Sequence, residues 1–170
     1  RYSMSNQNKD VTLKDEINNA LSYLYIMKMR YEHMLEYTYN TDESINNTKV
    51  PKLILQPILE NCFKHGFRDV YPPWHIEINI YQRENYWYVS ISNNGNPFSD
   101  DKLNKLINHF QEFKKTFNSP TSGQLPESEL GVGLKNTIIR LWIFYKGKEY
   151  FKVERKDGKT IITIGGVILE

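Results

Sequence analysis

Two pairs of alternating segments restrict the fold of this chain more than any other feature of its sequence. Isoleucine alternates with polar residues across 74–83, and a second alternating segment, 86–92, follows after a short turn. The segments 149–154 and 160–168 repeat this arrangement around the turn-forming pair Asp157-Gly158. Successive side chains of a strand point to opposite faces, so each segment can bury one face. The two hairpins predict a largely antiparallel sheet.

Apolar residues at helical spacing supply a second layer that can cover this sheet. The first such segment begins at a capping-box spacing, Thr12 to Asp15, and repeats apolar residues every three or four positions to Tyr31. Pro57 lies inside the second segment, which predicts a kink or a late helix start there. The other predicted elements are a strand over 34–40 and helices over 51–66, 100–113 and from 131 onward. This order predicts an α+β fold, with helices on one face of a mixed, mostly antiparallel sheet.

Length and charge are those of an ordinary single domain. The 170 residues carry 22 Lys and Arg against 20 Asp and Glu, a balance that favours neither a nucleic-acid surface nor an acidic tail. Trp87 and Trp142 stand at apolar positions and are predicted to be core residues, not stacking platforms for bases. Cys62 has no second cysteine as a partner, which indicates a reducing compartment such as the cytoplasm. No apolar run reaches the roughly 18 residues of a membrane span.

Four polar residues interrupt the otherwise apolar second helical segment. They are Glu60, Asn61, Lys64 and His65. Residues three and four apart lie over one another on a helix, so Asn61, Lys64 and His65 are predicted to share a face. An amide oxygen, an ammonium and an imidazole in one place suit a magnesium-bound phosphate chain. A solvated helix face explains the same residues equally well when this segment is taken alone.

Two glycine-containing turns follow further along the chain. Asn93-Asn94-Gly95-Asn96 ends a predicted strand, and Gly131-Val132-Gly133 opens a predicted helix. A helix N-terminus of this kind offers unpaired backbone N–H groups and a positive dipole end to phosphate. A single Gly-x-Gly is weak support for a phosphate site by itself. The interpretation therefore depends on the order in which the motifs follow one another.

Taken in order, these motifs resemble those of sensor histidine kinases. The segment 55–66 resembles the asparagine box, in the form typical of autolysis and nutrient-sensing regulators of Gram-positive bacteria. Asn93-Asn94-Gly95 stands where the family has its first glycine box, 131–136 resembles the second, and Gly158-Lys159-Thr160 resembles the closing Gly-x-Thr strand. The resemblance covers roughly Val11 to the end of the chain.

The resemblance implies a two-layer α/β sandwich, the ATP-binding fold shared with type II topoisomerases, Hsp90 chaperones and mismatch-repair ATPases. Residues 11–170 would form this catalytic domain, with a lid over ATP at about 114–130, for which a plain linker is the alternative. Residues 1–10 would be what remains of a linker to a missing dimerisation and phosphoacceptor region, because the chain lacks an initiator Met and a signal-peptide pattern.

The resemblance also implies roles for individual residues. Glu60 would be catalytic, orienting or deprotonating the attacking group, and a surface salt bridge is the less favoured explanation of a glutamate there. Asn61 would coordinate Mg²⁺, and Lys64 and His65 would neutralise phosphate charge. The remaining nucleotide-binding positions would be Asn93, Gly95, Gly131, Gly133, Leu134, Lys135, Asn136 and Thr160.

Several positions depart from the family pattern. Asn93 replaces an aspartate that accepts the adenine amino proton, and Pro97 replaces the second glycine of that box. Pro57 stands where many relatives have another asparagine, although this subfamily tends to have Gln-Pro there. None of the other histidines, His33, His75 and His109, has the sequence context of the family's phosphoacceptor.

The resulting hypothesis is an ATP-dependent protein-histidine kinase domain. With ATP and Mg²⁺ it would pass the γ-phosphoryl group to a histidine of the dimerisation domain, and a response regulator would then receive the phosphate on an aspartate. The full protein would be a homodimeric, membrane-bound bacterial sensor with this domain in the cytoplasm, and the fragment alone would be monomeric. The alternatives are an inactive nucleotide-binding or regulator-docking module of the same fold and, less favoured, an ATP-hydrolysing relative.

Overall fold

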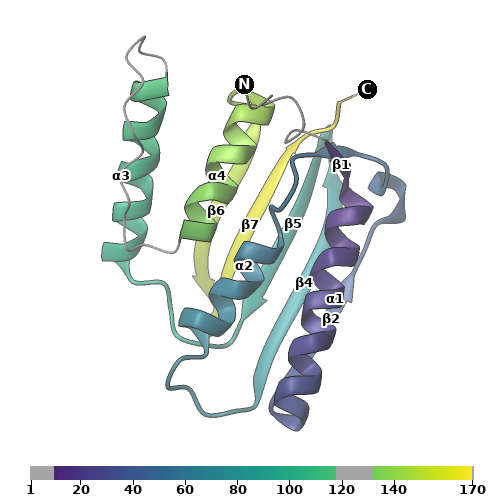
Figure 1. The fold of residues 1–170 in the computed structure, drawn as a ribbon, viewed down its shortest axis with the longest axis vertical. Helices are drawn as coiled ribbons and strands as arrows, with labels where there is room; N and C mark the ends of the chain where they lie inside the picture. The colour runs from purple at the N-terminus through teal and green to yellow at the C-terminus, as the bar shows by residue number, and fades with distance from the viewer. Residues whose placement is uncertain (1–9, 118–131, 170) are drawn as a thin grey trace, which may run out of the picture.

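The computed structural model describes residues 10–117 and 132–169, which form a sheet covered by helices (Figure 1). The five-stranded sheet has the order β2-β4-β5-β7-β6. Its strands are β2 (Leu35–Asn40), β4 (Trp74–Arg83), β5 (Tyr86–Asn93), β7 (Lys159–Val167) and β6 (Glu149–Lys156). β2 runs parallel to β4, and the other neighbours are antiparallel. The predicted α+β fold with a mixed, mostly antiparallel sheet is therefore confirmed.

The helices α1 (Leu13–Tyr31), α2 (Gln56–Asn61) and α4 (Val132–Tyr145) cover one face of this sheet, and α3 (Asp100–Phe117) lies beside α4 (Figure 1). The predicted capping box begins α1, because Thr12 Oγ1 accepts the Asp15 N–H at 3.2 Å while Asp15 Oδ2 accepts the Thr12 N–H at 2.9 Å. None of the described helices is long and apolar enough to cross a membrane.

The second predicted helix starts late, as the position of Pro57 suggested. Leu53 has a left-handed backbone with φ of 59°, and the helix begins only at Gln56, with Pro57 in its first turn. The helix then widens into a π turn, η4 (Cys62–Gly66), in which the Phe67 N–H donates to the Cys62 carbonyl at 2.8 Å. The sequence pattern did not reveal this change of helix type.

Short elements that were not predicted frame the start of α1 and of β2. β1 (Val11–Thr12) pairs antiparallel with β3 (Lys49–Val50), and two 3₁₀ turns, η2 (Glu32–Met34) and η3 (Glu43–Ile45), lie on either side of β2. Such short segments leave no periodicity for a sequence pattern to detect.

The two tryptophans have different surroundings. Trp87 on β5 is fully buried, and its Nε1–H donates to the Tyr145 hydroxyl of α4 at 2.9 Å, which confirms it as a core residue. Trp142 is only half-buried and meets the edges or faces of Phe110, Phe113 and Phe117, so it joins α4 to α3.

The predicted lid is only partly within the described residues. Residues 114–117 belong to the last turn of α3, which is longer than the predicted helix 100–113. The rest of the predicted lid, 118–130, and Gly131 lie outside the described residues.

Candidate functional site

A cavity of about 290 Å³ opens where the segment after α2, the end of β5, α3 and the start of α4 meet. Its lining residues are Asn61, His65, Gly66, Arg68, Asp69, Asn93, Asn96, Pro97, Phe98, Lys102, Leu106, Leu134 and Thr160. The cavity thus gathers five of the predicted site residues, namely Asn61, His65, Asn93, Leu134 and Thr160.

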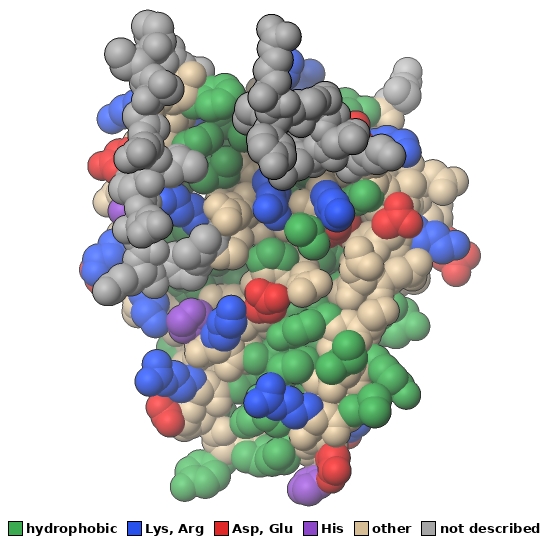
Figure 2. All heavy atoms as spheres, in the orientation of Figure 1, with side chains coloured by type: hydrophobic (Ala, Val, Ile, Leu, Met, Phe, Trp, Pro, Cys, Tyr) green, Lys and Arg blue, Asp and Glu red, His purple; other side chains and the backbone are tan. Residues whose placement is uncertain are grey.

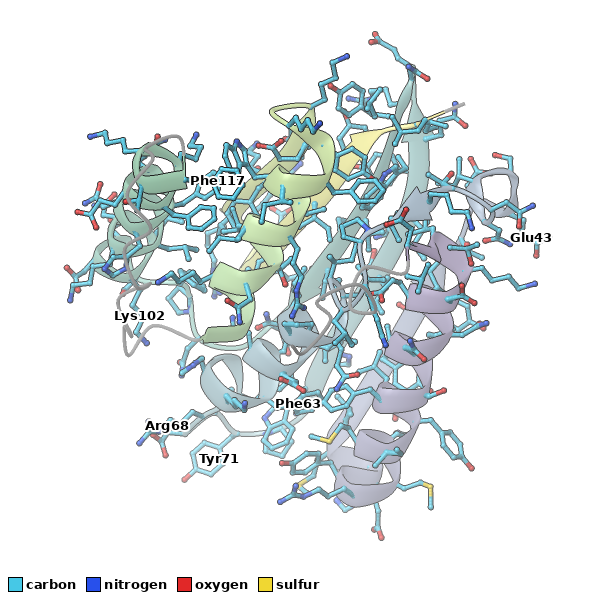
Figure 3. All side chains as sticks on the ribbon, turned by 45° about the horizontal axis from the view of Figure 1, so that its top comes forward. Glu43, Phe63, Arg68, Tyr71, Lys102 and Phe117 are labelled. Atoms are coloured by element: carbon cyan, nitrogen blue, oxygen red, sulfur yellow. The ribbon has the colours of Figure 1, made fainter. Side chains whose placement is uncertain are left out.

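Charged and apolar groups both line this cavity. Pro97, Phe98, Leu106 and Leu134 contribute apolar surface, and Leu106 and Leu134 are each 3% exposed. The ionisable lining residues are His65, Arg68, Asp69 and Lys102. Figure 2 shows Lys, Arg and His side chains gathered between η4 and the start of α3, and Figure 3 shows Lys102 and Arg68 on that same side of the molecule. An amphipathic anion, with one flat apolar part, suits such a lining.

His65 is the titratable group of the cavity whose environment matters most. Burial lowers the pKa of His65, and the positive charges of Lys102, Lys64 and Arg68 lower it further. A bound anion would supply the opposite charge and favour the protonated imidazole. His65 can therefore take up a proton when an anion binds.

Asn93 is a buried polar residue of the cavity lining. It is 5% exposed, its Oδ1 accepts the Gly95 N–H at 3.0 Å, and its Nδ2 donates to Cys62 Sγ at 3.5 Å. Burial raises the pKa of the Cys62 thiol to about 12, so the thiol stays protonated and donates to the Ile58 carbonyl at 3.5 Å. The amide group is thus held from both ends.

Gly95 and Gly66 are needed because two backbone segments touch beside this amide. A Cβ on Gly95 would lie 2.1 Å from the Gly66 carbonyl oxygen, and a Cβ on Gly66 would lie 2.9 Å from Asn93 Oδ1. The Asn96 N–H also donates to the Gly66 carbonyl at 2.6 Å. The turn after β5 and the end of η4 are therefore joined into one wall of the cavity.

Arg155 is a residue of this wall that the sequence did not single out. It lies on β6 opposite Thr160 of β7, and its Nη1 donates to the Gly95 carbonyl at 3.0 Å and to Thr160 Oγ1 at 2.9 Å. Thr160 Oγ1 donates in turn to the Asn96 carbonyl at 3.4 Å. An arginine opposite the closing threonine is detectable only once the hairpin register is known.

The predicted shared face of the second helix is correct for Asn61 and His65 but not for Lys64. Asn61 and His65 both line the cavity, whereas Lys64 Nζ lies 3.9 Å from Glu60 Oε2 outside it. Glu60 also lies outside the lining, and its Oε1 accepts from Gln56 Nε2 at 3.1 Å. Both pairs are four residues apart, so Asn61 and His65 share one side of the helix while Glu60 and Lys64 share the neighbouring side.

The glycine-box residues of α4 occupy different places. Leu134 lines the cavity, while Lys135 is 7% exposed and Asn136 is half-buried outside the lining. Packing against α2 favours glycine at position 133, because a Cβ added there would lie 3.0 Å from Cβ of Pro57. Gly131 lies outside the described residues. Close contact between α4 and α2 is thus one role of this box.

Residues 53–55 connect three helices just before α2. Glu16 of α1 is 2% exposed and accepts the N–H groups of Leu53, Ile54 and Leu55 at 2.7, 2.8 and 3.2 Å. From α4, Arg140 Nη1 donates to the Leu53 carbonyl at 2.9 Å and Thr137 Oγ1 to the Ile54 carbonyl at 3.4 Å. This connection sets α2, with Asn61, against the start of α4.

Comparison with known proteins identifies relatives of this chain. Over 100 residues it is 26% identical to the sensor protein LytS of Staphylococcus epidermidis, a match that covers 59% of this chain and 17% of the relative. It is 31% identical over 102 residues to LytS of Streptococcus agalactiae, with coverages of 59% and 17%. The sensor histidine kinase YesM of Bacillus subtilis is 26% identical over 103 residues, with coverages of 61% and 18%. The chain is a homologue of the LytS-type sensor histidine kinases.

Solved structures agree with this relationship at the level of the fold. The catalytic domain of the histidine kinase ThkA superposes with a TM-score of 0.62 at 14% identity, and the match covers 95% of each chain. A mycobacterial sensor histidine kinase, MprB, superposes with a TM-score of 0.58 at 14% identity, covering 94% of this chain and 97% of the other. No protein-family profile matches the sequence. The matches span less than a fifth of the length of the LytS and YesM relatives named above.

Proposed function

We propose that this domain binds Mg-ATP in the cavity and presents the γ-phosphoryl group to a histidine of a second domain of the same kinase. The observation that supports this most is that the lining combines apolar surface at Leu106 and Leu134 with the cations Arg68 and Lys102 and the titratable imidazole of His65. A flat base fits the apolar surface and a phosphate chain the cations. A response regulator would receive the phosphate next, and we place the domain on the cytoplasmic side of a membrane-bound sensor, where ATP is available.

The donor set fits a magnesium ion that arrives with the nucleotide. Among the described residues, no group of His, Cys, Asp and Glu side chains could hold a metal ion without further ligands. Mg²⁺ normally keeps several waters and uses one or two protein oxygens together with substrate phosphates. The Asn61 amide oxygen would be such a ligand, since Asn61 lines the cavity. When bound, the ion would neutralise charge on the phosphate oxygens.

Glu60 fits a role toward the second domain better than toward the nucleotide. Its side chain is 34% exposed next to the cavity wall, one residue before Asn61. A carboxylate in this position can reach an imidazole that approaches from outside and accept or orient its proton. Gln56 Nε2 donates to the Glu60 carboxylate at 3.1 Å, and Lys64 Nζ lies 3.9 Å from its other oxygen. The ion pair with Lys64 is also what a purely structural Glu60 would show.

The second candidate function is an inactive module that binds nucleotide but transfers nothing. The specific observation in its favour is Asn93, because its carbonyl oxygen already accepts the Gly95 N–H and the amide carries no charge. Pro97, also in the lining, removes one backbone donor from the same wall. Both features weaken adenine recognition in this interpretation.

Calorimetric titration with the β,γ-imido analogue of ATP tests the proposal. We expect magnesium-dependent binding by the wild-type domain, and Asn61→Ala is expected to lose the magnesium dependence. Lys64→Ala is the matched control, because Lys64 lies on the same turn but outside the cavity. Absence of binding at millimolar nucleotide would refute the nucleotide site. Binding without phosphotransfer in a full-length protein would favour the inactive module.

A further inference from the structure

We propose that the cavity accepts purine nucleotides with either a 6-amino or a 6-oxo group, because the buried group that meets the base is the Asn93 amide. This inference rests on the proposed function, since it concerns the nucleotide of that same site. It assigns Asn93 as the residue that determines which bases are accepted.

The base is expected against the most buried residues of the lining. Leu106 and Leu134 are each 3% exposed there, and Asn93 and Thr160, at 5% and 3%, are the buried polar residues of the lining. The cations Arg68 and Lys102, with His65 once it is protonated, suit the phosphates instead. A flat heterocycle between apolar side chains therefore directs its polar edge at Asn93 and Thr160.

The Thr160 hydroxyl already has two hydrogen-bond partners in the protein. Its hydroxyl hydrogen donates to the Asn96 carbonyl at 3.4 Å, while the oxygen accepts from Arg155 Nη1 at 2.9 Å. A hydroxyl carries one hydrogen and two lone pairs, so only one lone pair is left. Of these two buried side chains, Asn93, whose amide has two N–H hydrogens, is consequently the stronger candidate for a donor to the base.

The orientation of that amide follows from its two partners. The Gly95 N–H can only donate, so the side-chain atom 3.0 Å from it must be the oxygen. Cys62 Sγ then faces Nδ2 at 3.5 Å, and the thiol hydrogen is directed at the Ile58 carbonyl. Each amide atom has used one hydrogen bond, which leaves one lone pair on Oδ1 and one hydrogen on Nδ2.

One remaining acceptor and one remaining donor can serve two kinds of purine edge. A 6-amino group can donate to Oδ1, and a 6-oxo group can accept from Nδ2. A carboxylate at this position would offer acceptors only, and a 6-oxo purine would then place oxygen against oxygen. An unpaired buried polar pair of that kind costs a large factor in affinity.

Titration with the β,γ-imido analogues of ATP and ITP, with magnesium, tests the inference. We expect the two dissociation constants of the wild-type domain to agree within about tenfold. Asn93→Asp is expected to keep the ATP analogue and to weaken the ITP analogue by about 100-fold or more. Thermal melting of Asn93→Asp without ligand establishes that the variant is folded. The comparison of the two dissociation constants in the wild-type domain does not depend on this variant.

The outcomes separate this inference from the function on which it rests. A wild-type domain that binds the ATP analogue and prefers it to the ITP analogue by more than about 100-fold would refute the role of Asn93 while leaving the nucleotide site in place. A wild-type domain that binds neither analogue would refute the nucleotide site itself. Similar affinities of the wild-type domain for the two analogues, together with a preference of Asn93→Asp for the ATP analogue, would support both the nucleotide site and the role of Asn93.

Discussion

Replacing Glu16 by glutamine isolates the contribution of one buried carboxylate to the fold and the site. Oε2 of Glu16 accepts the N–H groups of Ile54 and Leu55, and Oε1 accepts the Leu53 N–H. In Glu16→Gln, the remaining oxygen can keep the first two bonds, but the new NH₂ group faces the Leu53 N–H, which then has no acceptor. The side-chain volume is nearly unchanged, so the change measures hydrogen bonding and charge.

The expected loss follows from the bonds that are broken. A hydrogen bond to a charged group contributes about 1.5 to 3 kcal/mol, and the lower part of this range applies because the Leu53 N–H is only partly buried. We therefore expect Glu16→Gln to lower the free energy of unfolding by about 2 kcal/mol. For a domain of this size, that corresponds to a fall in melting temperature of about 4 to 8 °C.

Differential scanning calorimetry of the wild type, Glu16→Gln and Glu112→Gln measures this effect. Glu112 is exposed on α3, so its change to glutamine removes the same charge without a buried bond. Glu112→Gln is expected to melt within about 1 °C of the wild type. If Glu16→Gln also melted that close to the wild type, the assignment of a stabilising role to the Glu16 carboxylate would be wrong.

Three further predictions concern the site. Glu60→Gln in a full-length kinase should abolish phosphoryl transfer while the affinity for the ATP analogue changes less than about twofold; wild-type transfer rates would rule out its proposed role. Arg155→Ala should weaken nucleotide binding about tenfold by releasing the turn at Gly95, whereas Lys152→Ala on the same strand should not, as calorimetry can measure. Cys62 should not react with a thiol reagent at pH 8 in the folded domain, because burial raises the pKa of its thiol to about 12, and should react once the domain is unfolded in urea; rapid labelling of the native protein would contradict this burial.

The sequence by itself determined the features that depend on near neighbours. The two hairpins, the capping box of α1 and the late start of α2 at Pro57 follow from alternation, helical spacing and the missing proline N–H, all of which act over a few residues. The motif order led to the histidine kinase family, and five of the residues assigned through it line one cavity.

Only the tertiary structure decided the contacts between segments that are distant in the chain. Glu16 binds backbone groups 37 to 39 residues away, and Arg155 reaches Gly95 across 60 residues. Lys64 pairs with Glu60, four residues before it, and does not line the cavity with Asn61 and His65. The spacing of residue types shows which secondary structure each segment prefers. Strand register, helix type and buried hydrogen-bond partners are set by how the segments pack, because the buried polar groups of one segment must be paired with groups of another segment.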